Sequence, residues 1–390
     1  MSRIAFFCIP AHGHTNPTLE VVRELIRQGH EVIYFSYSML REKIESTGAK
    51  FIPCDEYDCE QNLKEEDRSR IGSDIAFSMK VLVDTTLALD EMVCRVLEER
   101  KVDCVVTDSM AVWGKAAAMK LGIPFVVSNT TFAFNKQSSQ AMRPSLKELF
   151  SLIRDMKKGN REVKRLSSKG YPFKNVLDII SNDNKTDSIV YTSCEFQPFS
   201  ETFSDKYVFV GPSIRPAEEV WEKTKEKLVY ISMGTVDNDK VPFYKNCIEA
   251  FKDTDYQVVM SVGNLVELST FDPLPENISV FESVDQIAVL EKADVFLSHC
   301  GMNSVNESLY FEVPLVTHPG TKEQLTVAVR AEELGAGVRL EEESPENIRR
   351  LVDEVINTER YHENASKISE GFKQCSGTKG AVKKIHTMCR

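Results

Sequence analysis

The sequence predicts an α/β protein made of two successive domains, each built on a parallel sheet covered by helices. Its length of 390 residues is enough for two or three compact domains, each with its own core. Short apolar runs alternate with helical segments over roughly the first 130 residues, and the same alternation restarts near residue 228. Such alternation is typical of parallel sheets with right-handed crossover connections.

The first domain is expected to begin with a strand buried on both faces, because residues 4–9 are a continuous apolar run. Asn16 is the expected N-cap of the helix that follows, with Pro17 at its first position. A Lys/Arg/Ser-rich stretch at about 135–185 predicts helices and loops inserted into this domain. Its other strands are expected at 31–36, 103–108, 124–128, 188–193 and 207–211, and its main helices at 75–100 and 111–122.

A proline-containing stretch at 212–226 is the expected linker between the domains. We therefore expect an N-terminal domain at 1–211, a C-terminal domain at 227–374, and a helix at 375–390 that packs back on the N-terminal domain. In the second domain strands are expected at 228–232, 257–262, 278–283, 294–298 and 313–319, and helices at 243–252, 285–293, 302–311 and 322–335, with further helices to the end. Any ligand is expected in the cleft that the two domains face.

Charge and composition exclude several classes of partner. Acidic residues outnumber basic ones by 59 to 48, which gives a net charge of −11. Proteins that bind mainly nucleic acid or anionic lipid usually carry the opposite sign, so neither is an expected partner. The ten cysteines show no zinc-type spacing and predict buried thiols in a reducing compartment. Without a signal peptide or a membrane-length apolar run, we expect a cytoplasmic protein.

The clearest functional pattern follows the strand expected at 294–298. His299, Cys300 and Gly301 would turn tightly into a helix, and Gly301 would let the backbone approach a ligand closely. The start of that helix offers N–H groups and a partial positive charge, which suit a phosphate. Asn303 and Ser304 would add further donors there. Each of these residues alone could be a turn or cap residue, but together they favour an anion site.

Two acidic positions extend this pattern. Glu307 lies about one helical turn beyond the expected anion site, so its carboxylate could accept hydrogen bonds from a sugar diol. Glu323 and Gln324 follow the next strand and are expected at the same rim of the sheet. The pattern therefore predicts a site for a ligand that carries both phosphate and sugar.

The segment 294–324 resembles the donor-binding signature of the inverting UDP-glycosyltransferases, which have two Rossmann-like domains in the GT-B architecture, and among them the bacterial macrolide and flavonoid glucosyltransferases. The resemblance implies that His299, Gly301, Asn303 and Ser304 hold the diphosphate and that Glu307 binds the uridine ribose. It assigns the sugar hydroxyls to the pair Glu323-Gln324, a pair that favours glucose. The matching residues are His299-Cys300-Gly301-Met302-Asn303-Ser304, Glu307, Val313-Pro314 and Glu323-Gln324.

Two further segments resemble the same family. Residues 283–290, SVDQIAVL, are similar to the family's uracil-binding segment and retain Gln286. Ser283 stands where an aromatic ring often stacks on the base, Asp285 replaces a proline, and Phe281 is a possible substitute for the stacking ring. Residues 232–236 are similar to the family's Gly-rich turn, so phosphate contacts are implied for Gly234 and Thr235. Glu312, in place of a glycine, is read as a change at a loop tip.

The catalytic prediction rests on HGHTNP at 12–17. A histidine at the carboxyl end of the first strand would point toward a ligand, and imidazole has a pKa suited to a general base. The resemblance implies that His14 is this base and that Asp108, at the end of another strand, is its partner acid. A buried carboxylate on the far ring nitrogen would fix the tautomer. In the alternative reading, His12 and His14 cap the following helix and Asp108 is a helix N-cap. We favour the reading in which His14 and Asp108 form a catalytic dyad. His12 is then expected only to shape the loop.

These parts predict transfer with inversion, in which the acceptor oxygen attacks the anomeric carbon and UDP leaves. Donors at the helix start would stabilise the charge on the diphosphate, so neither a metal nor another cofactor is expected. The stretch Asp237-Asn238-Asp239 superficially resembles a metal-binding D-x-D motif, but we read it as solvated surface. The partners expected are a UDP-sugar and a small, hydroxylated, hydrophobic acceptor.

The acceptor pocket is expected in the first domain. Its candidate residues are Phe77, Asn129, Phe132 and Phe134, although core packing is the alternative for the last two. Aromatic lining suggests a flavonoid, a macrolide or another polyphenol. Two other functions use the same scaffold: a UDP-sugar epimerase and a nucleotide-sugar sensor without turnover. A dehydrogenase is disfavoured because the first strand–helix turn lacks G-x-G-x-x-G.

Overall fold

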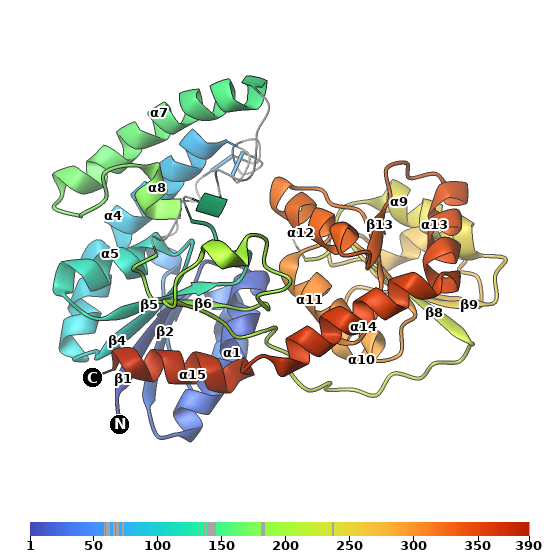
Figure 1. The fold of residues 1–390 in the computed structure, drawn as a ribbon, viewed down its shortest axis with the longest axis horizontal. Coiled ribbons are helices and arrows are strands. Elements are labelled where there is room, and N and C mark those ends of the chain that lie inside the picture. The colour runs from blue at the N-terminus through green and yellow to red at the C-terminus, as the bar shows by residue number, and fades with distance from the viewer. Residues whose placement is uncertain are drawn as a thin grey trace. The chain divides into compact units, whose positions relative to one another are not determined.

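The computed structural model describes residues 1–57, 59, 63–64, 67, 70–71, 74–135, 137–138, 146–180, 184–235 and 238–389. The chain forms two compact units. Unit 1 contains Met1–Ser213 and Ser376–Arg390, and unit 2 contains Ile214–Cys375. Each unit has one parallel sheet with helices on its faces, so the predicted fold class of two parallel-sheet α/β domains is confirmed (Figure 1).

Unit 1 contains a seven-stranded sheet in the order β3-β2-β1-β4-β5-β6-β7, with every pair parallel. Its strands are β1 (Arg3–Phe7), β2 (Glu31–Ser36), β3 (Lys50–Pro53), β4 (Cys104–Asp108), β5 (Phe125–Asn129), β6 (Ser188–Val190) and β7 (Tyr207–Phe209). Its helices are α1 (His12–Arg27), α2 (Arg41–Glu45), α4 (Ile75–Glu99), α5 (Val112–Leu121), α7 (Leu146–Ser168), α8 (Val176–Ile180) and α15 (Gly377–Met388).

Strand β1 is buried on both faces, as its apolar run predicts. Ile4 and Phe6 pack into the core shared with α1, whereas Ala5 and Phe7 pack into the core shared with α4 and α5. After the exposed Arg3 at its start, the strand is buried along its length. Functional side chains must therefore follow the strand, where its carboxyl end meets the loops.

The segment at 146–180 adds a helical layer to unit 1. Helix α7 packs along α4, and Val163 and Leu166 of α7 join a core cluster with Met79 and Val83 of α4. Val176 of α8 completes the same cluster. The inserted helices are therefore anchored by an apolar core of their own, on the α4 side of the sheet (Figure 1).

Helix α15 belongs to unit 1, although it follows unit 2 in the chain. Its residues Ala381, Val382 and Ile385 are buried in the same cluster as Ile4 of β1 and Val22 of α1. In Figure 1 this helix lies alongside α1, and the two helices contact each other directly. The first sheet is thus covered on one face by helices from both ends of the chain.

Unit 2 contains a six-stranded parallel sheet in the order β10-β9-β8-β11-β12-β13. Its strands are β8 (Lys227–Ser232), β9 (Tyr256–Ser261), β10 (Ile278–Phe281), β11 (Val295–Ser298), β12 (Leu315–Thr317) and β13 (Gly337–Arg339). Its helices are α9 (Val241–Phe251), α10 (Gln286–Leu290), α11 (Met302–Tyr310), α12 (Lys322–Glu333), α13 (Pro345–Asn357) and α14 (Glu359–Gln374).

Two sequence predictions of secondary structure are wrong. Helix α1 begins at His12 with Ala11 as its N-cap, so Asn16 is not the cap and Pro17 lies inside the helix. Residues 337–339 form β13 rather than part of a helical run, because they pair with β12 at the sheet edge. Among the described residues, every helix is too short or too polar to span a bilayer.

Candidate active site

In unit 1, three polar side chains meet where neighbouring strands end. His14 lies in the first turn of α1, directly after β1, while Asp108 is the last residue of β4 and Thr130 follows β5. Strands β1, β4 and β5 are adjacent and parallel, so their carboxyl ends lie at one edge of the sheet. The topology therefore brings together residues that are far apart in sequence.

The imidazole of His14 is held by a buried carboxylate. His14 Nδ1 lies 2.8 Å from Asp108 Oδ2, and the Asp108 side chain is only 1% exposed, against 17% for His14. The other oxygen, Asp108 Oδ1, accepts from the backbone N–H of Met110 at 2.8 Å. A carboxylate in this position accepts from an Nδ1–H group, an arrangement that leaves the lone pair on Nε2. This is the tautomer that a general base requires.

Thr130 adds a hydroxyl to this pair and was not singled out from the sequence. Its Oγ1 lies 3.0 Å from His14 Nδ1 and donates to Asp108 Oδ2 at 3.4 Å. Thr130 is buried, at 2% exposure, so the pair has little contact with bulk water on that side. The only sequence signal for Thr130 was its position directly after a predicted strand.

The structure does not support the alternative reading, in which His12 and His14 cap α1 and Asp108 is the N-cap of α5, because the N-cap of α5 is Ala111. Neither His12 nor His14 caps α1, because Ala11 is the N-cap and has no side-chain hydrogen bond of that kind. Asp108 does shape the loop before α5 through Met110, in addition to its contact with His14. His12 lies 3.5 Å from Lys43 Nζ, and desolvation together with that charge lowers the pKa of His12.

In unit 2, the predicted anion site lies at the carboxyl end of β11. Cys300 has a φ of +65°, which produces the tight turn between β11 and α11, and Gly301 is the N-cap of α11. A Cβ at Gly301 would lie 2.7 Å from His299 Nε2, and one at Gly234 would lie 2.5 Å from the same atom. The His299 ring thus occupies a space that exists only because both neighbours are glycines.

The start of α11 has the features expected of a phosphate site. Gly301 supplies no side-chain cap to this nine-residue helix, and the N-terminus of such a helix carries a partial positive charge that favours an anion. Asn303 and Ser304 lie in the first turn, half-buried. Gly234 and Thr235 follow β8, which is adjacent to β11, so the Gly-rich turn lies at the same edge of the sheet.

Glu307 and Gln286 form a hydrogen-bonded pair. Gln286 Nε2 donates to Glu307 Oε2, and its Oε1 accepts from Tyr230 OH at 3.2 Å. Desolvation raises the pKa of Glu307 to about 7, although the Gln286 hydrogen bond and the charge of Arg215 lower it. Tyr230, which orients Gln286, was missed from the sequence because its position on β8 indicated only a buried strand.

The segment before Gln286 shows how Asp285 and Phe281 are used. Asp285 caps α10 by accepting from the backbone N–H of Ile287 at 3.2 Å. Ser283 is exposed. Phe281, at the end of β10, is 37% exposed and contacts Trp221 edge-on at 5.7 Å. An aromatic surface is therefore present near this edge of the sheet, two residues before the position of Ser283.

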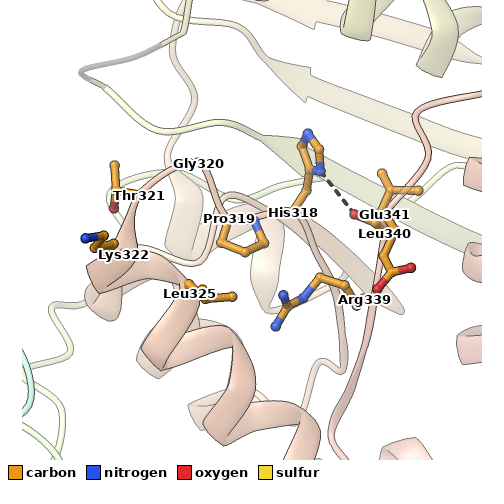
Figure 2. A pocket seen from close by; sticks show the side chains of 9 residues that line it. All are labelled: His318, Pro319, Gly320, Thr321, Lys322, Leu325, Arg339, Leu340 and Glu341. Carbon is orange, nitrogen blue, oxygen red and sulfur yellow. Dashed lines mark hydrogen bonds between the residues drawn. The ribbon is translucent and has the colours of Figure 1, made fainter. Parts of the chain in front are cut away.

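A cavity of about 500 Å³ lies at the carboxyl ends of β12 and β13, and its lining includes Lys322 and Leu325 but neither Glu323 nor Gln324. Figure 2 shows Lys322 and Leu325 of α12 on one side and Arg339 on the other, with His318 turned toward the Leu340 carbonyl oxygen. Gln324 Oε1 accepts from the N–H groups of Gly320 and Thr321, so its amide also forms the capping box of α12. Glu323 is exposed beside it.

The four candidate acceptor residues do not form one cluster. Phe132 is 4% exposed and packs against Phe196, and Asn129 is 5% exposed and donates to the carbonyl oxygen of Ile189. Phe134 is half-buried. Phe77, also half-buried, lies at the start of α4 beneath the guanidinium of Arg70. Phe77 and Phe134 therefore retain the exposure that a ligand contact needs.

The D-x-D-like stretch is partly structural. Asn238 is 1% exposed, and its Nδ2 donates to the carbonyl oxygen of Gly234 at 3.2 Å, so the interpretation of this residue as solvated surface is wrong. Asp239 is exposed, and Asp237 lies outside the described residues. Within the described part of the chain, no group of three or more His, Cys, Asp or Glu side chains has the arrangement of a metal site.

Comparison with known proteins identifies similar chains over the full length. A family model described as "UDP-glucoronosyl and UDP-glucosyl transferase" matches residues 216–375. The uncharacterized UDP-glucosyltransferase YdhE of Bacillus subtilis (strain 168) is 31% identical, covering 100% of this chain and 99% of its own. The demethyllactenocin mycarosyltransferase of Streptomyces fradiae is 27% identical over 97% of this chain and 84% of its own. The solved structure of the glycotransferase of kitacinnamycin has a TM-score of 0.85 and 26% identity, covering 99% of this chain and 98% of that one.

Proposed function

This chain belongs to the family of UDP-glucoronosyl and UDP-glucosyl transferases, and from that premise we propose that it transfers glucose from UDP-glucose to a hydroxyl of a small hydrophobic acceptor, with inversion at the anomeric carbon. The observation that carries the proposal is the contact of 2.8 Å between His14 Nδ1 and Asp108 Oδ2. A histidine held in this way in a glycosyltransferase has a clear role as a base, because the acceptor hydroxyl must lose a proton during the reaction.

In the proposed reaction, His14 Nε2 takes the proton of the acceptor hydroxyl as its oxygen attacks the anomeric carbon. The bond between that carbon and the phosphate oxygen breaks, and UDP leaves with the electron pair. Asp108 stabilises the imidazolium that forms, and Thr130 keeps the carboxylate in place. A base positioned like this typically contributes about 10²–10⁴ in rate.

The donor is proposed to bind unit 2. The N–H groups at the start of α11, with His299 and Ser304, would receive the diphosphate, on which negative charge grows as UDP leaves. Glu307 would accept from the ribose hydroxyls, held by Gln286. Glu323, in the first turn of α12, would bind the sugar hydroxyls.

The acceptor is proposed to be a hydroxylated hydrophobic natural product: a macrolide, a flavonoid or another polyphenol. Two of the similar proteins above are named for demethyllactenocin and for kitacinnamycin, which supports a natural-product acceptor. Phe77 and Phe134 are each only half-buried, so each could contribute an aromatic contact to a flat or greasy molecule. A donor panel crossed with macrolide and phenolic acceptors, analysed by mass spectrometry, tests the proposal, and NMR of the product tests inversion.

Two outcomes of that panel would contradict the proposal. Interconversion of UDP-sugars without acceptor would indicate an epimerase, and binding of UDP-glucose without turnover on any acceptor would indicate a sensor. We also propose that no metal is required, because the α11 N-terminus and His299 would themselves balance the charge of the diphosphate. Loss of activity in EDTA with recovery in manganese would contradict this part.

A further inference from the structure

Asp285 receives an unusual number of hydrogen bonds for one carboxylate. Its Oδ1 accepts from Arg215 Nη2 and from the backbone N–H of Ile287, which starts α10. Its Oδ2 accepts from the backbone N–H groups of Glu218 and Glu219, at 2.6 and 3.2 Å. The side chain is only 5% exposed. One carboxylate thus joins residues 215–219 to the first turn of α10.

The residue after Asp285 is Gln286, which contacts the proposed ribose site. Its amide donates to Glu307 and, at 3.4 Å, to Ser304 Oγ, and it accepts from Tyr230. The direction of the Gln286 side chain depends on where α10 begins, because Gln286 is the first residue of that helix. The Asp285 carboxylate fixes this point.

Arg215 and Asp285 also act on Glu307 through their charges. Desolvation is the main reason that the pKa of Glu307 is raised, while Arg215 lowers it and Asp285 raises it. Desolvation disfavours the charge of Asp285 itself, but the Arg215 hydrogen bond and the backbone N–H of Glu218 outweigh it and hold the pKa of Asp285 below its usual range. The ion pair therefore remains charged around neutral pH and lies close enough to influence the carboxylate.

We propose that Asp285 and Arg215 are positioning residues of the donor site: together they fix the start of α10, and so align the Gln286–Glu307 pair with the ribose diol of a nucleoside diphosphate. This inference rests on the proposed function, because it assumes that Glu307 receives the ribose. Neither residue needs to touch the donor. Their effect is transmitted through the backbone of residues 285–286 and the amide of Gln286.

The test measures binding of two probes to the full-length protein by titration calorimetry. UDP carries the ribose diol, whereas 2′,3′-dideoxyuridine diphosphate has the same base and phosphates without it. The variant Asp285→Asn keeps an N-cap side chain but loses the charge that holds Arg215. We expect its UDP affinity to fall about five- to fiftyfold, as for a binding group moved out of alignment, while affinity for the dideoxy probe stays within about twofold of wild type.

A matched control is present in the same unit. Asp294, 16% exposed, accepts from Lys223 Nζ at 2.6 Å and from the backbone N–H of Leu228 at 2.7 Å, directly before β11. Like Asp285, Asp294 contacts a cationic side chain and accepts from a backbone N–H group. Unlike Asp285, it lies at the amino end of the sheet, away from the proposed donor site. Asp294→Asn is expected to lower the melting temperature as Asp285→Asn does, and to leave both affinities unchanged.

Arg215 variants provide a second, independent measurement. Arg215→Ala should weaken UDP binding, and Arg215→Lys should recover at least half of that loss in affinity. The UDP affinity of the double variant Arg215→Ala/Asp285→Asn should be no more than about twofold lower than that of Asp285→Asn alone. The proposal is overturned if Asp285→Asn binds UDP like wild type, or if it loses affinity for both probes equally. Failure of the wild-type protein to bind UDP at all would instead contradict the proposed function.

Discussion

His14 Nδ1 lies 2.8 Å from Asp108 Oδ2, although 94 residues separate the two along the chain. The contact exists because β1 and β4 are neighbouring parallel strands, so the loop after one strand meets the end of the other. The buried carboxylate determines which nitrogen of the ring carries the hydrogen.

Replacing His14 by alanine should lower the rate of transfer by about 10²–10⁴, because the acceptor hydroxyl loses its base. UDP affinity should remain within about twofold of wild type, since His14 is not part of the donor site. The rate is measured by product formation and the affinity by calorimetry. His12→Ala is the matched control and should keep most of the activity; full activity in His14→Ala would show that the base is another residue.

Asp108→Asn should lower turnover by about 10²–10⁴ with little change in the KM for either substrate. An asparagine that presents its amide N–H to Nδ1 would stabilise the opposite tautomer, whose lone pair faces away from the acceptor. Thr130→Val removes only the hydroxyl, so we expect a loss of less than about tenfold. If Thr130→Val lowered turnover more than Asp108→Asn does, the role assigned to the Asp108 carboxylate would be contradicted.

Gly234→Ala should lower UDP affinity by at least about tenfold, because the new Cβ would lie 2.5 Å from His299 Nε2 and force the ring to move. The backbone φ of +84° adds strain of about 1–2 kcal/mol for a residue with a side chain. Gly122→Ala, at a φ of +68° with nothing within 4 Å of the new Cβ, isolates that strain. It should lower the melting temperature without changing UDP affinity.

Glu307→Gln should stabilise the protein at alkaline pH while weakening UDP binding. Desolvation raises the pKa of Glu307 in the folded state to about 7. In the unfolded chain the same carboxyl group has a pKa of roughly 4.3. The folded state therefore binds more protons between these values, and wild-type stability falls as pH rises through that window. At pH 8 the variant should be more stable by roughly 1–3 kcal/mol, and the difference should vanish near pH 4.

The same change gives a binding test. Wild-type UDP affinity should decline as the pH falls below about 7, because the protonated carboxyl accepts hydrogen bonds from the ribose less strongly. Affinity of Glu307→Gln should be lower and nearly independent of pH. Equal pH profiles for the two proteins, by calorimetry at matched ionic strength, would exclude Glu307 as the group that titrates.

Residues at strand ends were predictable from the sequence, and contacts that depend on tertiary packing were not. His14 and Asp108 follow apolar runs that are readable as buried strands, and parallel strands place such ends together. The cap of α1 was misassigned because Asn16-Pro17 has the local pattern of a helix start, yet the chain already turns into the helix at His12. Local cap preferences are weak compared with the packing of α1 on β1.

Strand β13 and the contacts of Asp285 show the same limit. Residues 337–339 are three residues long, too few for an alternating pattern, and become a strand only by pairing with β12. Asp285 and Arg215 are 70 positions apart, and no periodicity links them. The capping box of Thr321 and Gln324 at the start of α12 was likewise not predicted, because Gln324 was read only as a sugar-binding residue.

The placement of α15 has a consequence for biosynthesis. Ala381, Val382 and Ile385 complete a core that also contains Ile4, yet they are translated after the whole of unit 2. At ordinary elongation rates the interval between residues 213 and 390 lasts roughly 10–35 s. During that time the apolar strip that α15 later covers would be exposed on the nascent first unit. Ribosomes stalled before residue 377 should therefore hold this unit in a protease-sensitive state.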